Sequence, residues 1–154
     1  MSAAAPSPGL IALASDHAGF ALKEQLKPVF EQLGRRFEDL GTRDETSCDY
    51  PDFAHRAARG LTEGRFALAV LVCGTGIGMS IAANRHPGVR AAVCTESFAA
   101  RMARAHNDAN VLCLGARIVG LGVAQETLRA FLEARFEGGR HGGRVRKLEP
   151  GSST

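Results

Sequence analysis

Short apolar runs alternate along the chain with longer segments in which apolar residues recur every three or four positions. The short runs predict buried strands, and the longer segments predict helices. The predicted strands cover residues 10–14, 36–39, 66–72, 89–94 and 111–114. The predicted helices cover residues 18–33, 50–63, the segment from Gly78 to Asn84, 95–105 and 121–136. Almost wholly apolar strands that alternate with helices are typical of a parallel sheet covered on both faces. The pattern therefore predicts an α/β fold, a Rossmann-like three-layer αβα sandwich with a five-stranded parallel sheet.

Local signals add detail to this pattern. Pro28 lies inside the first helix and predicts a kink or a weakened turn near Glu24. Asp49 precedes the second helix, which we expect it to cap. Phe98 and Met102 are expected to face inward from the fourth helix. After Glu137 the chain is rich in glycine and basic residues, which predicts an extended tail.

Composition limits the classes of protein that fit. A length of 154 residues favours one domain, here residues 10–147, with flexible ends at 1–9 and 148–154. A formal net charge of +3 is too small to indicate nucleic-acid binding, and the basic tail has one nearby aromatic residue, Phe136, instead of a stacking series. No apolar run approaches the roughly 20 residues that a membrane helix needs. We therefore expect neither a nucleic-acid partner nor a membrane-spanning segment.

The cysteines are spaced unlike those of a metal site. Cys48, Cys73, Cys94 and Cys113 are far apart, with no CxxC pair and no adjacent histidines of ligand spacing. The first nine residues lack the basic and apolar regions of a secretory signal. We therefore expect reduced thiols, a cytoplasmic location and no metal.

The stretch from Phe66 to Asn84 is the strongest candidate for a functional site. Its apolar strand ends at Cys73 and leads through Cys73-Gly74-Thr75-Gly76-Ile77-Gly78 into a helix. This arrangement gathers backbone N–H groups and the positive end of the helix dipole around one point, which suits a phosphate or a reaction oxyanion. Cys73 is the candidate nucleophile or base of the loop, because a helix N-terminus favours a thiolate. A lone thiol at a strand end is nevertheless more often packed than catalytic.

The same glycines resemble a dinucleotide-binding fingerprint, with Glu96 near the place of a ribose-binding acid. Met79, however, occupies the position of the third glycine, and the motif follows the third strand instead of the first. No Gly-Lys-Ser/Thr follows, so the loop is not a Walker A motif either. The sequence therefore disfavours a nucleotide cofactor, and we expect no cofactor.

Polar side chains follow several of the predicted strands. In an open α/β sheet, ligands bind beyond the carboxyl ends of the strands. These ends carry Ser15-Asp16-His17, Cys73-Gly74-Thr75, Thr95-Glu96 and Gly115-Ala116-Arg117. Each group alone is equally consistent with a helix cap or a surface charge. Their shared location favours a site.

Three further groups have competing interpretations. His106 is expected just past a helix end, where a C-cap role competes with a functional one. His55 and His86 are assigned to the surface. Arg140 and Arg144 place two guanidiniums on a glycine-rich chain that is able to close over a phosphate, although such clusters usually belong to a solvated tail.

Six motifs taken together resemble a known family. They occur in the order Ser15-Asp16-His17-Ala18-Gly19, Asp49-Tyr50-Pro51, Cys73-Gly74-Thr75-Gly76-Ile77-Gly78, His106-Asn107-Asp108-Ala109-Asn110, Gly115-Ala116-Arg117 and Glu137-Gly138-Gly139-Arg140-His141. This series resembles the ribose-5-phosphate isomerase B family, within a wider group that includes galactose-6-phosphate and allose-6-phosphate isomerases. The resemblance covers about residues 10–147, almost the whole chain.

The resemblance implies a role for each matching residue. Cys73 matches a thiolate base that moves a proton between C1 and C2 of the open-chain sugar. Thr75 and the N–H groups of Gly74, Gly76 and Gly78 match the groups that hold a cis-enediolate. His106 matches the residue that opens the furanose ring, with assistance from Asp16. The implied phosphate ligands are His17, Arg117, Arg140 and Arg144, and Asn107 matches a sugar-hydroxyl contact. Tyr50 is a side chain on which the width of the pocket is expected to depend. A branch of the family replaces the cysteine with a glutamate six residues further on. Met79 stands there, which indicates the cysteine branch.

The resemblance further implies a homodimer, in some members a tetramer, with shared active sites. His106, Asn107 and Arg117 are expected to face the partner's Cys73 loop. The expected activity is an aldose–ketose isomerase that interconverts ribose 5-phosphate and ribulose 5-phosphate through a cis-enediolate. Two alternatives stay open: a six-carbon isomerase acting on allose 6-phosphate or galactose 6-phosphate, and a non-catalytic phosphosugar-binding module.

Overall fold

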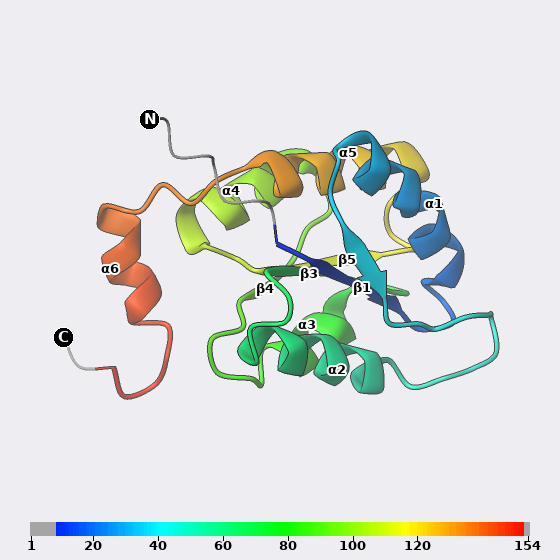
Figure 1. Cartoon of the computed structure of the whole chain (residues 1–154), viewed down its shortest axis with the longest axis horizontal. Helices are drawn as coiled ribbons and strands as arrows, with labels where there is room; N and C mark the ends of the chain where they lie inside the picture. Colours follow the sequence, from blue (N-terminus) through cyan, green and yellow to red (C-terminus); the bar gives the residue numbers. More distant parts are fainter. Residues whose placement is uncertain (1–8, 153–154) are drawn as a thin grey trace.

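The computed structural model describes residues 9–152, so the ends 1–8 and 153–154, predicted as flexible, lie outside the described part. Strands and helices alternate along the chain (Figure 1). The strands are β1 (Ile11–Ser15), β2 (Phe37–Asp39), β3 (Leu68–Cys73), β4 (Ala91–Val93) and β5 (Val111–Gly115). The helices are α1 (Phe20–Gln32), α2 (Tyr50–Thr62), α3 (Ile77–Ala83), α4 (Ser97–Asn107), α5 (Leu121–Glu133) and α6 (Arg140–Arg146).

The five strands form one parallel sheet in the order β2-β1-β3-β5-β4. The three central strands, β1, β3 and β5, are buried at every position. This explains why their sequences are almost wholly apolar, because a strand covered on both faces has no solvent side. The predicted α/β fold with a five-stranded parallel sheet is confirmed.

Two apolar layers enclose the sheet, as the helices above and below it in Figure 1 show. Side chains of α1, α4 and α5 cover one face together with alternate strand residues such as Leu13 and Leu112. Side chains of α2 and α3 cover the other face together with the intervening residues, among them Leu71 and Cys73. This two-residue alternation follows from the pleat of a strand. It directs the Cys73 side chain to the face covered by α2 and α3.

A buried ion pair ties α1 to the edge strand β2. Lys23 is fully buried, and its Nζ lies 2.8 and 2.7 Å from the two carboxylate oxygens of Asp39. Lys27 lies 2.8 Å from the same carboxylate. Burial acts to raise the pKa of Asp39, but the hydrogen bonds from the two lysines outweigh it and hold that pKa below its ordinary value. The carboxylate of Asp39 thus takes the place of water as the hydrogen-bond partner of the buried Lys23 ammonium.

Helix α1 runs from Phe20 to Gln32 with Pro28 inside it, and the kink or weakened turn expected near Glu24 stays a prediction. Other local predictions need correction. Asp49 occupies the N-cap position of α2 with extended backbone, but its side chain accepts no capping hydrogen bond. Phe98 is 62% exposed instead of inward-facing, because α4 packs through small residues such as Ala100 and leaves the phenyl ring outside. Met102 is half-buried.

The tail predicted as extended is also different in the structure. Gly138 and Gly139 have φ values of +67° and +54°, a region that favours glycine, and they turn the chain into helix α6. His141 anchors this helix, being only 7% exposed. Beyond it, a carboxylate oxygen of Glu149 accepts a hydrogen bond from the Gly88 N–H at 2.8 Å. Within residues 9–152, none of the helices has the length and apolar character needed to cross a bilayer.

Candidate active site

The candidate site residues fall into two groups. One lies at the carboxyl ends of the strands, here called the carboxyl edge of the sheet, and the other lies at their amino ends, the amino edge. Asp16, His17, Tyr50, the loop 73–78 and Arg117 follow or flank the carboxyl ends of strands. The second group is formed by His106, Asn107, Arg140 and Arg144. Helix α4 starts beyond the carboxyl end of β4 and runs back, so its last residues lie beside the start of β5. The five residues of β5 span about 13 Å at ~3.3 Å per residue, which separates the two groups within one chain.

Cys73 is the last residue of β3, and its sulfur lies under the glycine loop. The Gly76 N–H donates a hydrogen bond to Cys73 Sγ at 3.1 Å. Gly76 has φ +79°, and this left-handed turn bends the loop back over the sulfur. The Cys73 residue is 4% exposed, so the described chain leaves little of it open to solvent. A donor aimed at sulfur interacts more strongly with a thiolate than with a thiol, because charge-assisted hydrogen bonds are the stronger ones.

The other N–H groups of the loop divide into used and free donors. The Ile77 N–H donates to Thr75 Oγ1 at 3.3 Å, and Gly76 is engaged with the sulfur. Within residues 9–152, the N–H groups of Gly74, Thr75 and Gly78 donate to no acceptor. Three free main-chain donors and one thiol therefore share a loop at the carboxyl edge. This is a suitable arrangement for charge that develops on an oxygen.

Asp16 and His17 lie beyond the end of the neighbouring strand β1. Asp16 is 6% exposed, and its Oδ1 accepts from the Gly19 N–H at 3.0 Å. The Cys48 N–H donates to His17 Nδ1 at 3.2 Å. An Nδ1 atom that accepts a hydrogen bond carries no proton, so the neutral ring has its proton on Nε2. His17 therefore presents an N–H donor through its other nitrogen.

Tyr50 and Arg117 flank the glycine loop. A Cβ atom on Gly78 would lie 2.6 Å from the ring of Tyr50, so the ring rests directly on this glycine. Arg117 packs against Gly74 in the same way, and its N–H donates to the Gly74 carbonyl at 3.0 Å. Arg117 was expected to face the loop of a partner chain. The structure instead places it on the loop of its own chain, because the turn after β5 is pinned to the turn after β3.

Three members of the second group, His106, Asn107 and Arg144, line a cavity of about 250 Å³ beside α6. It is lined by His106, Asn107, His141, Arg144, Val145 and Leu148. His106 lies in the last turn of α4 and not past its end, because the C-cap residue is Asp108. The His106 ring stacks on His141, with centroids 4.2 Å apart and planes 8° apart. Glu137 Oε2 lies 3.8 Å from His106 Nε2 and 3.6 Å from His141 Nε2.

Sequence reasoning assigned no role to Glu137 and His141. Both belong to the motif Glu137-Gly138-Gly139-Arg140-His141, which was the available signal. Their ligand atoms and that of His106 lie within 4.8 Å of one another, so this group is also the candidate metal site of the described chain. The sequence alone did not bring these side chains together, because Glu137 stands 31 positions after His106.

The remaining thiols differ from Cys73 in their surroundings. Burial, with a contribution from Glu96, raises the pKa of Cys94 to about 11. Burial also raises the pKa of Cys113 well above its ordinary value. Cys48 is half-buried beside His17. Cys94 and Cys113 are therefore poor nucleophiles, since the thiolate is the reactive form.

Two other candidates have structural roles. Glu96 is the N-cap of α4, and its carboxylate accepts from the Phe98 and Ala99 N–H groups at 2.6 Å each. This occupation of both oxygens favours the capping interpretation over a ribose contact. His55 and His86, assigned to the surface, are half-buried and contact each other at 2.7 Å.

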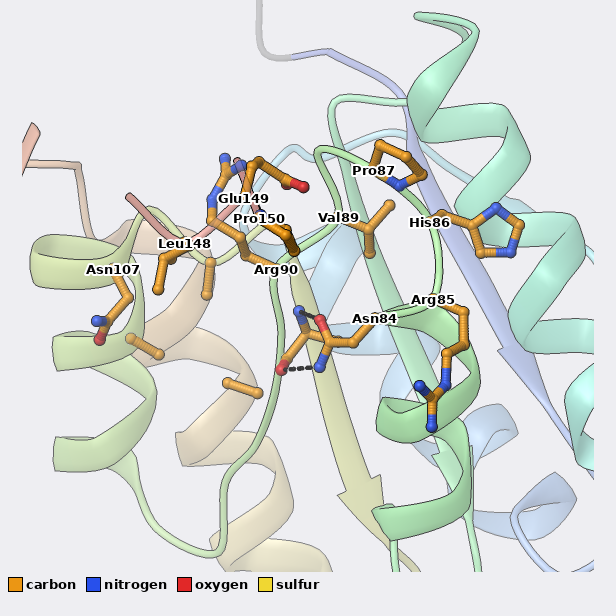
Figure 2. A pocket seen from close by; sticks show the side chains of 14 residues that line it. Asn84, Arg85, His86, Pro87, Val89, Arg90, Asn107, Leu148, Glu149 and Pro150 are labelled. Carbon is orange, nitrogen blue, oxygen red and sulfur yellow. Dashed lines mark hydrogen bonds between the residues drawn. The ribbon is translucent and has the colours of Figure 1, made fainter. Parts of the chain in front are cut away.

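A larger cavity of about 670 Å³ lies apart from the carboxyl edge (Figure 2). It is bounded by the segment 84–92, by α4 and by the C-terminal residues Leu148 to Pro150. Asn84 covers the start of the edge strand β4 here, because its side-chain amide pairs with both the N–H and the carbonyl of Ala91. Of the candidate site residues only Asn107 lines this cavity, so it is separate from the thiol and its N–H donors.

Fold and site together define the class of protein: a three-layer α/β protein with a thiol and free main-chain donors at the carboxyl edge of its sheet, and cationic side chains nearby. Comparison with known proteins names the family. Residues 11–148 match the model of the Ribose/Galactose Isomerase family, and the chain belongs to that family.

Individual relatives agree with this assignment. Ribose-5-phosphate isomerase B of Escherichia coli K12 is 43% identical over 90% of this chain and 93% of its own length. A solved structure of ribose-5-phosphate isomerase B from Clostridium thermocellum has a TM-score of 0.88 and 47% identity, covering 90% of this chain and 94% of that one. A ribose 5-phosphate isomerase from Thermotoga maritima has a TM-score of 0.87 and 46% identity, covering 91% and 97%.

Proposed function

We propose that this protein is an aldose–ketose isomerase that interconverts ribose 5-phosphate and ribulose 5-phosphate through a cis-enediolate. The observation that carries the proposal is the thiol of Cys73 beside the free N–H groups of Gly74, Thr75 and Gly78. Membership of the Ribose/Galactose Isomerase family supports the same chemistry. The relatives named for ribose 5-phosphate favour the five-carbon substrate over a six-carbon one.

In this mechanism the Cys73 thiolate removes the proton from C2 of the open-chain aldose. The electron pair of the C–H bond moves toward the C1 carbonyl, and negative charge develops on O1. The free N–H groups of the loop and the Thr75 hydroxyl hold this oxygen. One fixed donor of this kind is worth about 2.7–4 kcal/mol of transition-state stabilisation. A proton moves from O2 to O1, and Cys73 returns its proton to C1 to give the ketose. No electron is lost or gained overall, so this route requires no redox cofactor.

Side chains from both groups of site residues hold the phosphate. His17 contributes Nε2–H, because its Nδ1 is occupied by the Cys48 N–H. Arg117 contributes a guanidinium from the same side of the loop. Arg140 and Arg144 are one helical turn apart on α6, so both side chains are able to face one anion.

We further propose a homodimer in which each reaction site uses two chains. Within one chain, Cys73 and His106 belong to opposite edges of the sheet, so a single chain does not bring them to one sugar. Exposed apolar side chains also gather around the carboxyl edge and along the β4 side, at Ile77, Ile81, Val93, Phe98, Ile118, Leu121 and Val123. Such a set on a protein surface indicates a protein contact. In an isologous dimer, the carboxyl edge of one copy meets the α4–α6 end of the other, and both sites form at once.

This pairing determines which copy of the chain provides each residue of a site. One copy provides Cys73, Thr75, Asp16, His17 and Arg117. The second copy provides His106 for ring opening, Asn107 for a sugar hydroxyl, and Arg140 and Arg144 for the phosphate. All four cysteines are free thiols, which suits a thiolate base and a reducing compartment such as the cytoplasm.

Turnover of ribose 5-phosphate by Cys73→Ala and Cys94→Ala variants tests the proposal. Cys73→Ala is expected to abolish turnover and still be stabilised thermally by the substrate. Cys94→Ala, which removes a thiol with a pKa of about 11, is expected to keep turnover. Appreciable activity in Cys73→Ala refutes the role of the base. Binding without turnover by the unaltered protein favours a phosphosugar-binding module. Faster turnover of allose 6-phosphate or galactose 6-phosphate than of ribose 5-phosphate favours a six-carbon enzyme.

A further inference from the structure

The buried ring of His141 is unexplained by the roles assigned above. His141 is 7% exposed, and its Nε2 atom is buried without a hydrogen-bond partner among the described residues. A buried imidazole nitrogen without a partner costs free energy, so its retention calls for a reason. The ring of His106 lies parallel to the ring of His141 at a centroid distance of 4.2 Å.

Glu137 joins the two rings. Its backbone N–H donates to the Ala105 carbonyl at 3.0 Å, which fixes the loop to the last turn of α4. The turn at Gly138 and Gly139 then returns the chain, so the Glu137 carboxylate faces both Nε2 atoms, at 3.8 and 3.6 Å. The Glu137 side chain is 57% exposed and has room to move. A shift of roughly 1 Å brings either contact to the 2.7–2.9 Å of a charge-assisted hydrogen bond.

A metal ion fits this arrangement poorly. A zinc ion lies about 2.0–2.1 Å from an imidazole nitrogen, in or near the plane of the ring. Two rings whose planes are 8° apart and whose centroids are 4.2 Å apart do not direct their lone pairs at one point. The surroundings are also cationic. Burial, with further contributions from His106 and Arg140, lowers the pKa of His141.

We propose that Glu137 and His141 are positioning residues for the opening of the sugar ring by His106. The inference rests on the proposed function, which gives His106 that step. Glu137 accepts a hydrogen bond from His106 Nε2–H, so Nδ1 is the nitrogen that exchanges a proton with the substrate. His141 packs face to face against His106 and fixes the plane of its ring. The pair thus holds one tautomer and one orientation, as a carboxylate does for the histidine of a catalytic triad.

The step balances without any other reactant. His106 Nδ1 accepts the proton of the C1 hydroxyl while the C1=O bond forms and the C1–O4 bond breaks. The electron pair of the broken bond stays on O4, and Nδ1 returns the proton to O4. Glu137 stabilises the imidazolium that exists between the two transfers. The products are the open-chain aldehyde and unchanged His106.

With ribulose 5-phosphate as the substrate, proton abstraction at carbon is measured without ring opening. Its O5 carries the phosphate, so the C2 ketone cannot close a furanose ring. Loss of its C1 proton signal in D₂O, followed by NMR, therefore requires the Cys73 step alone. Turnover of ribose 5-phosphate, which is mostly a closed ring, requires both steps. The two measurements on one variant show which step has failed.

We expect Glu137→Gln to lower turnover of ribose 5-phosphate on the order of 10²-fold, the lower end of what general acid–base catalysis contributes. C1 exchange of ribulose 5-phosphate should stay near the unaltered rate. His141→Phe, which keeps a stacking ring, should retain more ribose 5-phosphate turnover than His141→Ala. Glu126→Gln, an exposed glutamate of α5, is the matched control and should change neither rate.

Equal losses in both reactions for Glu137→Gln would show a structural effect and overturn the inference, as would no loss in either. His141→Phe and His141→Ala with equal turnover would remove the stacking role. If the unaltered protein exchanges no C1 proton of ribulose 5-phosphate, the proposed function itself fails, whatever the variants do.

Discussion

Mixed dimers offer a quantitative test of the two-chain site. The perturbation is a pair of variants, Cys73→Ala and His106→Asn, each expected to be inactive as a homodimer. Because these residues lie at opposite edges of one chain, the proposed pairing puts Cys73 of one copy in a site with His106 of the other. A mixed dimer then has one site with both lesions and one site with none. Its activity per dimer should be about half that of the unaltered protein.

The assay uses two affinity tags. Both variants are expressed together, each with its own tag, and dimers that carry both tags are purified in sequence. Random association without this selection gives half mixed dimers and about a quarter of the unaltered activity. If Cys73 and His106 served the same site within one chain, every site of a mixed dimer would contain one lesion. Mixed dimers with no activity above that of the parents would therefore refute the shared site.

Three further predictions concern phosphate binding, stability and thiol reactivity. Arg140→Ala should mainly raise KM for ribose 5-phosphate, because the phosphate is remote from the reacting carbons; a loss confined to kcat would count against the assignment. Asp39→Asn leaves the fully buried Lys23 without its main partner and should lower the free energy of unfolding by about 3 kcal/mol in a urea titration at pH 7, whereas the exposed Asp44→Asn should show no comparable loss. The folded pKa of Asp39 is below its ordinary value of 3.8, so the stability that its ion pair contributes is present above pH 3.8 and is lost as the pH falls through the lowered pKa. If Asp39→Asn and the unaltered protein differ as much in free energy of unfolding at pH 2 as at pH 7, the ion-pair account is contradicted. At pH 8 a thiol reagent should modify Cys48 faster than Cys94 and Cys113, whose raised pKa values leave little thiolate, and mass spectrometry that finds Cys94 modified first would be inconsistent with its burial.

The features that the sequence predicted well are local in the chain. Apolar strands and the helices between them follow from the side-chain pattern, and a parallel sheet follows from their alternation. The loop after Cys73 could also be predicted from the sequence, because the strand, the glycines and the helix are consecutive there. The turn at Gly76 and the sulfur contact from its N–H are the geometry that such a segment favours.

The features that were missed depend on contacts between distant segments. The tail after Glu137 is rich in glycine, and local propensity argues against a helix there. Helix α6 forms nonetheless, with His141 buried against the end of α4, a contact across 35 residues of sequence. The roles of Glu137 and His141 were hidden for the same reason. Phe98 was predicted inward on helical periodicity alone, which does not say which side of α4 is covered.

The division of the site between two edges has a simpler cause. Residues that follow strands share the carboxyl edge, and Asp16, His17, Cys73 and Arg117 do so. His106 instead ends a helix that runs back along the sheet, which brings it to the amino edge. The division of the site into two groups therefore follows from the order of the elements in the sequence, because α4 runs back along the sheet.

A crystal structure of the unaltered protein equilibrated with ribose 5-phosphate tests the central claim most directly. The account predicts an open-chain sugar with Cys73 Sγ about 3–3.5 Å from C1 or C2, the reach of a reacting pair. His106 of the partner subunit should contact the same sugar. A sugar bound in the cavity of Figure 2, or one whose C1 and C2 lie beyond contact with Cys73, would contradict it.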